Sequence, residues 1–215
     1  MAVSLLETVI PHLDHALRTV AGVPARQAGG RPSPSAGAPP AGPGPDTEET
    51  KRIGRLMRVN YAGEVAAQGL YLGQGLTART PEVARRMDQA AREEQDHLDW
   101  CAERLAVVDT PVSLLNPLWL GGSMAMGALV GLAGDRWSLG FVAETERQVM
   151  RHLQRHLAQI PDEDPATREV LEQMYLDERH HARWAEEGGG RPLPLPVRAA
   201  MGVTSRLMTF GSHWL

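Results

Sequence analysis

The stretches EQDH (residues 94–97) and ERHH (residues 178–181) carry the same pattern, Glu-x-x-His. Residues three positions apart lie on one face of a helix, so each glutamate and its histidine can bind the same metal ion. The positions one and two turns away from Glu94 and Glu178 are apolar, which indicates that both carboxylates face a core. Because an unpaired charge is costly there, we expect a metal ion to neutralise it.

Glu64 and Glu146 also lie on apolar helix faces, but neither has a histidine three residues later. Glu144 shares its face with Arg147, Gln148 and Arg151, so we expect it to be exposed to solvent. Four inward carboxylates and two inward histidines on four helices are the ligand set of a two-metal site in a ferritin-like bundle. The predicted metal ligands are Glu64, Glu94, His97, Glu146, Glu178 and His181.

The donor types and their neighbours refine this prediction. A set rich in carboxylates with only two histidines favours iron or manganese over zinc or copper. Ligand histidines usually donate their second N–H to a carboxylate, so Glu93 and Asp177 are expected to reach the histidine of the opposite helix. Four other residues are candidates to line the pocket, although packing is the favoured role for each: Tyr61, Tyr71, Tyr175 and His152.

The composition bounds the class of protein. The chain has 215 residues, enough for one domain with a substantial core. The net charge of −4, without a basic cluster, argues against binding to nucleic acid. The one cysteine, Cys101, excludes an internal disulfide and fits a reducing compartment. The N-terminus lacks the basic start and apolar run of a signal peptide, so we expect the protein in the cytoplasm or on a membrane facing it.

The chain divides into three parts. Residues 1–21 are predicted to form an amphipathic helix that docks on the main body or on a membrane. Residues 22–45 are rich in Pro and Gly and are expected to be a flexible linker. The main domain covers residues 46–215 and is predicted to be an all-α, ferritin-like four-helix bundle that holds the metal site. Asp46, Thr80 and Asp164 are the expected N-caps, and the expected helices are 46–76, 80–107, 137–159 and 164–187.

Two apolar segments accompany the bundle. Residues 110–134 carry no charge and are long enough to cross a bilayer, but Asn116, Pro117 and two glycines interrupt them. We favour a crossover that lies on the bundle or enters one leaflet, ahead of a fully buried crossover and of a true membrane span. Residues 195–215 form an amphipathic C-terminal segment, for which a membrane anchor and a helix capping the bundle are equally supported.

Five stretches together resemble the demethoxyubiquinone hydroxylase family, in its bacterial branch of 2-polyprenyl-3-methyl-6-methoxy-1,4-benzoquinone monooxygenases. The resemblance extends over nearly the whole chain, and the combination of motifs is specific. At Tyr61 the chain departs from the family, whose members commonly carry His there. The stretches are RVNYAGEV (58–65), EEQDHL (93–98), NPLW (116–119), TERQV (145–149) and DERHH (177–181).

This resemblance implies a di-iron monooxygenase of ubiquinone biosynthesis. The family's ligands fall on the same six residues, with Glu64 and Glu146 as the catalytic ligands that are freest to shift. The implied reaction uses O2 to hydroxylate the benzoquinone ring of a polyprenyl substrate. NADH is the expected electron donor, although no Rossmann fingerprint is present. The resemblance also implies a peripheral protein on the cytoplasmic side of the cell membrane, with other ubiquinone-biosynthesis proteins as partners and no nucleic acid.

Other functions on the same fold remain open at this point. A ferroxidase or iron-storage protein, or a di-metal peroxidase or catalase, would use a similar ligand set. A tRNA-modifying hydroxylase is disfavoured by the acidic net charge, and a rubrerythrin-like peroxidase by the single cysteine. A non-catalytic protein that binds a lipid or quinone would tolerate loss of the metal ligands.

Overall fold

The computed structural model describes residues 17–23, 30–36 and 47–215. Every regular element in these ranges is a helix, which confirms the predicted all-α fold. The helices are α2 (Glu48–Thr77), α3 (Pro81–Val107), α4 (Asn116–Leu132), α5 (Asp135–Leu157), α6 (Pro165–Glu187) and α7 (Leu195–Trp214).

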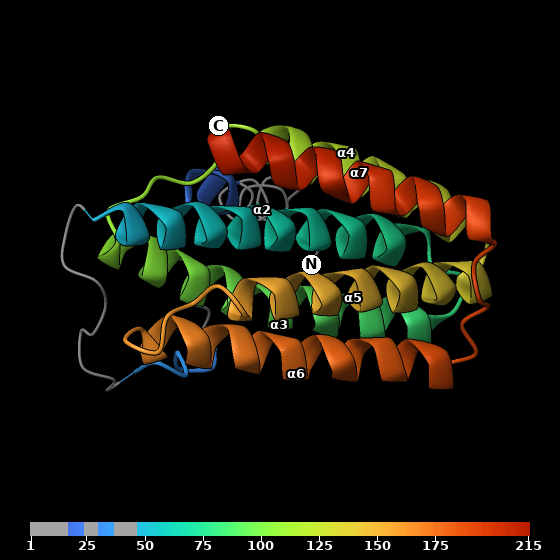
Figure 1. Cartoon of the computed structure of the whole chain (residues 1–215). Coiled ribbons are helices and arrows are strands. Elements are labelled where there is room, and N and C mark those ends of the chain that lie inside the picture. The colour runs from blue at the N-terminus through green and yellow to red at the C-terminus, as the bar shows by residue number, and fades with distance from the viewer. Residues whose placement is uncertain (1–16, 24–29, 37–46) are drawn as a thin grey trace, which may run out of the picture.

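Helices α2, α3, α5 and α6 form the four-helix bundle (Figure 1). The pairs α2–α3 and α5–α6 are two helical hairpins, and α4 is the long crossover between them. At the top of Figure 1, α4 and α7 lie side by side over α2. The arrangement confirms a ferritin-like bundle with an added crossover and an added C-terminal helix.

The helix starts follow the local capping rules. At α3, Thr80 Oγ1 accepts a hydrogen bond from the backbone N–H of Val83, and at α6 Asp164 accepts one from Thr167 at 3.0 Å. Both caps confirm the prediction. The cap predicted at Asp46 is wrong, because the N-cap lies one residue later, at Thr47, which accepts the hydrogen bond from the N–H of Thr50.

The crossover helix α4 packs on α2 through glycines of both helices. A Cβ added at Gly73 would lie 2.1 Å from the backbone oxygen of Met124, and one at Gly127 would lie 2.3 Å from that of Leu70. The two backbones therefore touch directly. The opposite face of α4 is exposed and apolar, so the alternative of a fully buried crossover is wrong. Within the described ranges, no helix combines the length and apolarity needed to span a membrane, which also excludes the alternative of a span.

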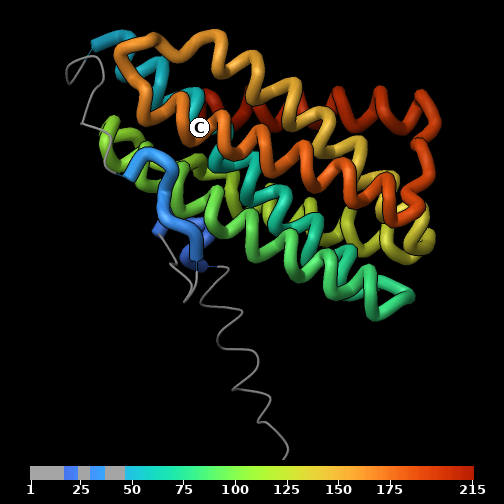
Figure 2. Tube along the Cα trace, turned by 90° about the horizontal axis from the view of Figure 1, so that it is seen from below, coloured from blue at the N-terminus to red at the C-terminus, as the bar shows by residue number. Residues whose placement is uncertain are grey.

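Two segments before the bundle lie against it. Residues 17–21 are helical, and the backbone oxygen of Thr19 accepts a hydrogen bond from the Tyr61 hydroxyl at 2.6 Å. Residues 30–36, part of the predicted linker, contact the outer side of α3 and α6 (Figure 2). The rest of the predicted N-terminal helix and linker lies outside the described residues.

The close contact of α2 with α4 can be tested by two variants, each of which replaces one glycine of α4 with alanine. Gly127→Ala should lower the free energy of unfolding by about 1–3 kcal/mol, because the new Cβ forces the helices apart. Gly122→Ala is the matched control, since its Cβ meets open space and helix propensity favours alanine. Urea unfolding measures both. Equal stabilities of the two variants would contradict the close contact.

Candidate metal centre

The bundle interior brings all six predicted ligands together, in two groups that share Glu178. One group combines Glu178 with Glu64, Glu94 and His97, and within it the potential ligand atoms lie within 4.8 Å of one another. The second group combines Glu178 with Glu146 and His181 under the same limit. All six side chains are buried. Helix periodicity explains the convergence, because each residue lies on the apolar face of its helix.

Glu94 and Glu178 lie between the two histidines. Glu94 directs Oε2 to His97 Nδ1 at 2.9 Å and Oε1 to His181 Nδ1 at 3.3 Å. Glu178 directs Oε1 to His97 Nδ1 at 3.3 Å and Oε2 to His181 Nδ1 at 3.1 Å. Each of these carboxylates therefore offers one oxygen to each half of the centre, which is the arrangement needed to bridge two cations.

The other two carboxylates serve one half each. Glu64 Oε2 lies 3.7 Å from His97 Nδ1, and Glu146 belongs to the group of His181. Tyr71 donates a hydrogen bond to Glu146 Oε1 at 2.5 Å. From the sequence, packing was the favoured role of Tyr71. The only signal for the hydrogen bond was its place two turns after Glu64 on the same apolar face.

The second nitrogen of each histidine contacts an acid on the opposite helix. His97 Nε2 lies 3.0 Å from Asp177 Oδ2, and His181 Nε2 lies 2.6 Å from Glu93 Oε2. Gln173 and Gln89, each one turn earlier, donate to the remaining oxygen of these acids. Since an Nε2–H donated to a carboxylate leaves Nδ1 for the interior, both rings have the orientation of metal ligands.

The pattern Gln-x-x-x-acid-Glu-x-x-His thus occurs twice, at residues 89–97 and 173–181. The two copies lie in different hairpins and face each other across the centre.

The buried charges perturb one another. Burial, followed by neighbouring glutamates, raises the pKa values of Glu64 and Glu146 well above the ordinary value. Burial alone would lower the pKa of His97 and of His181, but the surrounding carboxylates reverse this and raise both values. Burial opposes the ionisation of Glu94 as well, yet the charges and hydrogen bonds of the two histidines lower its pKa. The cluster therefore needs added positive charge, from protons or from cations.

Two divalent cations fit these residues. Their four positive charges balance the four ionised carboxylates of the two groups. Two buried oxygens, Glu94 Oε1 and Glu178 Oε1, have no hydrogen-bond partner among the described residues, although burying such atoms unpaired is costly. Both belong to the two glutamates that lie between the histidines, where a cation would satisfy them. The donor set, carboxylate oxygens and imidazole nitrogens without sulfur, suits iron or manganese.

Other residues expected near the centre take different places. The Tyr61 hydroxyl points to Thr19, outside the ligand groups. The His152 ring packs on that of His156, with centroids 3.9 Å apart, and neither belongs to a ligand group. Tyr175 accepts a hydrogen bond from Gln154 at 3.3 Å.

Glu144 is buried, so the expectation that it is exposed to solvent is wrong. Its Oε2 accepts a hydrogen bond from Arg198 Nε of α7 at 3.0 Å, and Arg147 and Arg151 of its own helix also pair with it. The cause is α7, which covers this face of α5 with its own arginine. The sequence of α5 alone does not indicate that α7 packs over Glu144.

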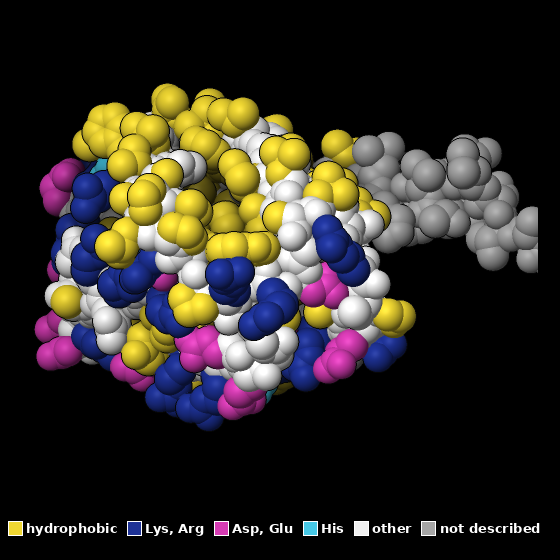
Figure 3. Space-filling view, turned by 90° about the vertical axis from the view of Figure 1, so that its right-hand side faces the viewer, with side chains coloured by type: hydrophobic (Ala, Val, Ile, Leu, Met, Phe, Trp, Pro, Cys, Tyr) yellow, Lys and Arg dark blue, Asp and Glu magenta, His cyan; other side chains and the backbone are white. Residues whose placement is uncertain are grey.

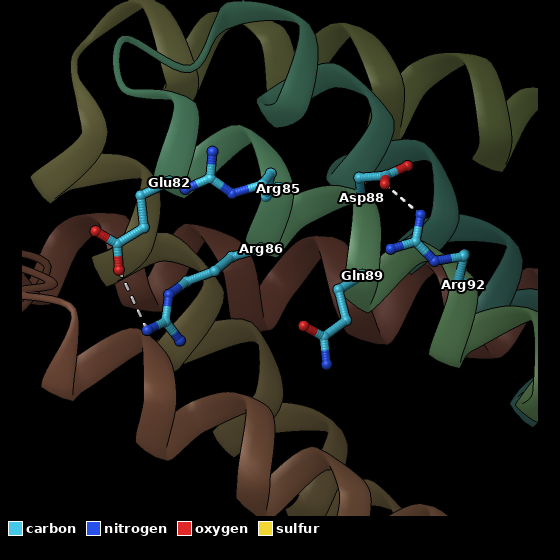
Figure 4. A pocket seen from close by; sticks show the side chains of 6 residues that line it. All are labelled: Glu82, Arg85, Arg86, Asp88, Gln89 and Arg92. Atoms are coloured by element: carbon cyan, nitrogen blue, oxygen red, sulfur yellow. Dashed lines mark hydrogen bonds and ion pairs between the residues drawn. The ribbon is translucent and has the colours of Figure 1, made fainter.

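A hollow of about 450 Å³ lies on the outer face of α3 (Figure 4). Within it, Arg86 pairs with Glu82 and Arg92 pairs with Asp88, each one turn apart and exposed. These pairs are typical of a solvated helix face. The lining residues are Glu82, Arg85, Arg86, Asp88, Gln89 and Arg92.

A four-helix bundle that buries four carboxylates and two histidines between two hairpins defines the class of ferritin-like carboxylate proteins. Residues 51–212 match the family described as ubiquinone biosynthesis protein COQ7. The chain therefore belongs to this family, which confirms the resemblance expected from the motifs.

Curated relatives agree over nearly the full length. A 3-demethoxyubiquinol 3-hydroxylase of Nitrosococcus oceani is 50% identical over 213 residues, covering 99% of this chain and 97% of the relative. The protein of the same name from Acinetobacter baumannii is 51% identical over 98% of this chain and 97% of the relative. The protein of this name from Cupriavidus metallidurans is 50% identical over 95% of this chain and 97% of the relative. Each of these relatives is named as a hydroxylase.

The charge balance predicts how pH affects the stability of chelator-treated protein. Because the pKa values of Glu64, Glu146 and both histidines are raised on folding, the folded state holds protons that the unfolded state loses as pH rises. The melting temperature of the chelator-treated protein should therefore be lower at pH 8 than at pH 6. Glu64→Gln should reduce this difference. The lowered pKa values of His152 and His156 act in the opposite direction over this range, so the comparison with Glu64→Gln decides: an unchanged difference in that variant would contradict the raised pKa of Glu64.

Proposed function

We propose that this chain is a di-iron monooxygenase that hydroxylates the ring of a polyprenyl demethoxyubiquinol in ubiquinone biosynthesis. The observation that carries the proposal is the buried cluster of four carboxylates and two histidines, in a chain half identical to hydroxylases of that name. The relatives' name specifies the reduced, quinol form of the ring.

Two iron ions would be held by the six side chains. Glu64 and His97 would supply ligands in one half of the centre and Glu146 and His181 in the other, while Glu94 and Glu178 have an oxygen available to each half. Bound iron supplies the redox chemistry with O2, in which one oxygen atom becomes the ring hydroxyl and the other leaves as water.

The remaining contacts orient and protect this centre. Asp177 and Glu93 fix the histidine rings through Nε2. Tyr71 donates its hydroxyl proton to Glu146 Oε1 and so orients this carboxylate. Buried apolar side chains such as Met57, Leu98 and Met174 exclude water from the interior.

Electrons come from an external reductant in this proposal, with NADH as the expected donor. The chain has no dinucleotide-binding fingerprint, and the described residues are helical or irregular. NADH would therefore act without a Rossmann domain of this chain.

The apolar face over α4 and α7 suits the surface of a membrane, where a polyprenyl substrate resides. Figure 3 shows apolar side chains gathered at the top of the molecule, around a hollow in the surface. We therefore place the protein peripherally on the cytoplasmic side of the cell membrane, where other ubiquinone-biosynthesis proteins are the expected partners. The exposed apolar side chains of the two helices include Leu118, Met126, Leu129, Leu132, Val203, Leu207, Phe210 and Trp214.

The metal assignment is tested by Glu178→Gln, which removes the carboxylate charge shared by both ligand groups. We expect about two irons per chain in the wild type, fewer in the variant, and turnover reduced by more than about 100-fold, beyond the loss typical of residues behind the ligands. The assay supplies a demethoxyquinone, NADH and air, and measures hydroxylated product and iron. Glu172→Gln is the matched control on an exposed position of the same helix.

The outcomes separate the candidate functions. Iron binding with no quinone product in the wild type would move the function to a ferroxidase or peroxidase. Wild-type protein without bound iron or manganese would contradict the metal centre.

Membrane contact is tested by sedimentation with vesicles. Phe210→Glu and Leu129→Glu should each weaken binding by about 10-fold or more, because each removes an apolar side chain worth about 1.5–3 kcal/mol when buried. Leu176→Glu is the control, since Leu176 is also exposed but lies on α6, on the far side of the bundle (Figure 1). Equal losses in all three variants would contradict the assigned face.

A further inference from the structure

Arg31 comes from the Pro/Gly-rich segment and joins the outer surfaces of α3 and α6. Its backbone N–H and Nε donate to the two oxygens of Asp96 at 3.1 and 2.9 Å. Its Nη2 donates to Asp177 Oδ2 at 2.8 Å. The guanidinium lies 4.9 Å from the ring centroid of Trp100, whose Nε1 donates to the Arg31 backbone oxygen. One residue thus makes contacts in both hairpins.

The contact with Asp177 connects Arg31 to the metal centre. Asp177 Oδ2 accepts from Arg31 Nη2 and also lies 3.0 Å from His97 Nε2. Gln173 donates to the other oxygen, at 3.0 Å. The carboxylate is therefore held from three sides, and its position sets the direction of His97 Nδ1. A charge-assisted hydrogen bond of this kind is stronger than a neutral one and fixes geometry.

The opposite half of the centre lacks this hydrogen bond, and Arg31 acts on Glu93 through its charge alone. Glu93 holds His181 as Asp177 holds His97, and Gln89 holds Glu93 as Gln173 holds Asp177. Among the described residues, however, no arginine donates a hydrogen bond to Glu93. Its side chain is 31% exposed, against 17% for Asp177. The two copies of the motif are thus alike inside the bundle and differ on its surface.

We propose that Arg31 is a positioning residue for the metal centre, which holds Asp177 and thereby strengthens metal binding at the Glu64 and His97 position relative to the Glu146 and His181 position. This inference rests on the proposed metal centre. The segment that contains Arg31 would then strengthen metal binding when it docks, and bound metal would in turn favour its docking. Such coupling is reciprocal by thermodynamic necessity.

The test is a titration of the chelator-treated full chain with cobalt. Calorimetry and the visible absorption of bound Co²⁺ monitor the binding. Wild-type protein should bind two ions per chain. Arg31→Gln should weaken one binding step by about 10-fold, the lower end of the loss seen for partners of ligand histidines, and leave the other step unchanged. Asp96→Asn, which removes the other anchor of Arg31, should weaken the same step.

The control is Arg52→Gln, because Arg52 has nearly the same exposure as Arg31 and pairs with Glu49 on the surface of α2. It should leave both steps unchanged. Melting temperatures separate positioning from general stabilisation, since Arg31→Gln should lower that of the cobalt-loaded protein more than that of the metal-free protein.

Two results would overturn the inference. In one, wild type and Arg31→Gln bind two cobalt ions equally well, which removes the role of Arg31 and leaves the metal centre intact. In the other, Arg31→Gln lowers both melting temperatures equally and leaves the affinities unchanged, which assigns Arg31 to the fold alone. Failure of wild-type protein to bind cobalt would instead remove the metal centre on which the inference rests.

Discussion

Four carboxylates buried together in an apolar interior impose the condition on which the structure depends. Their mutual repulsion and loss of hydration oppose folding unless positive charge lies among them. The two histidines supply part of this charge, and two divalent cations would supply all of it. The bundle must then keep four helices in one register, because a shift of one residue would turn a carboxylate away from the shared centre. The acids behind the histidines and the tyrosine beside Glu146 serve this requirement.

The sequence predicted the interior of the molecule well and its outer contacts poorly, for a physical reason. Helix periodicity and capping are local, so the four bundle helices and the inward faces of their six polar residues followed from short stretches. The burial of Glu144, the hydrogen bond between Tyr71 and Glu146, and the docking of Arg31 depend on pairs of elements distant along the chain. Helix α5 also begins and ends two residues earlier than predicted, because apolar spacing marks a helical face more sharply than its ends.

The two long sides of the bundle have different surfaces. On the α3 side, charges pair within one helix and remain in water. On the side of α4 and α7, large apolar residues remain exposed, although the inner face of α4 is in backbone contact with α2. Glycines permit this contact, so α4 packs on the bundle through its backbone. The large side chains of α4 therefore lie on the outer surface.

The repeated motif of the centre has a consequence for how its two halves can differ. Since one nine-residue pattern serves both hairpins, each position of the pattern in α3 has a counterpart in α6, and this part of the interior is close to twofold symmetry. A symmetric interior by itself gives two equivalent positions. The difference between the halves therefore lies outside the repeat, in the buried Tyr71 beside Glu146 and in surface residues such as Arg31 beside Asp177.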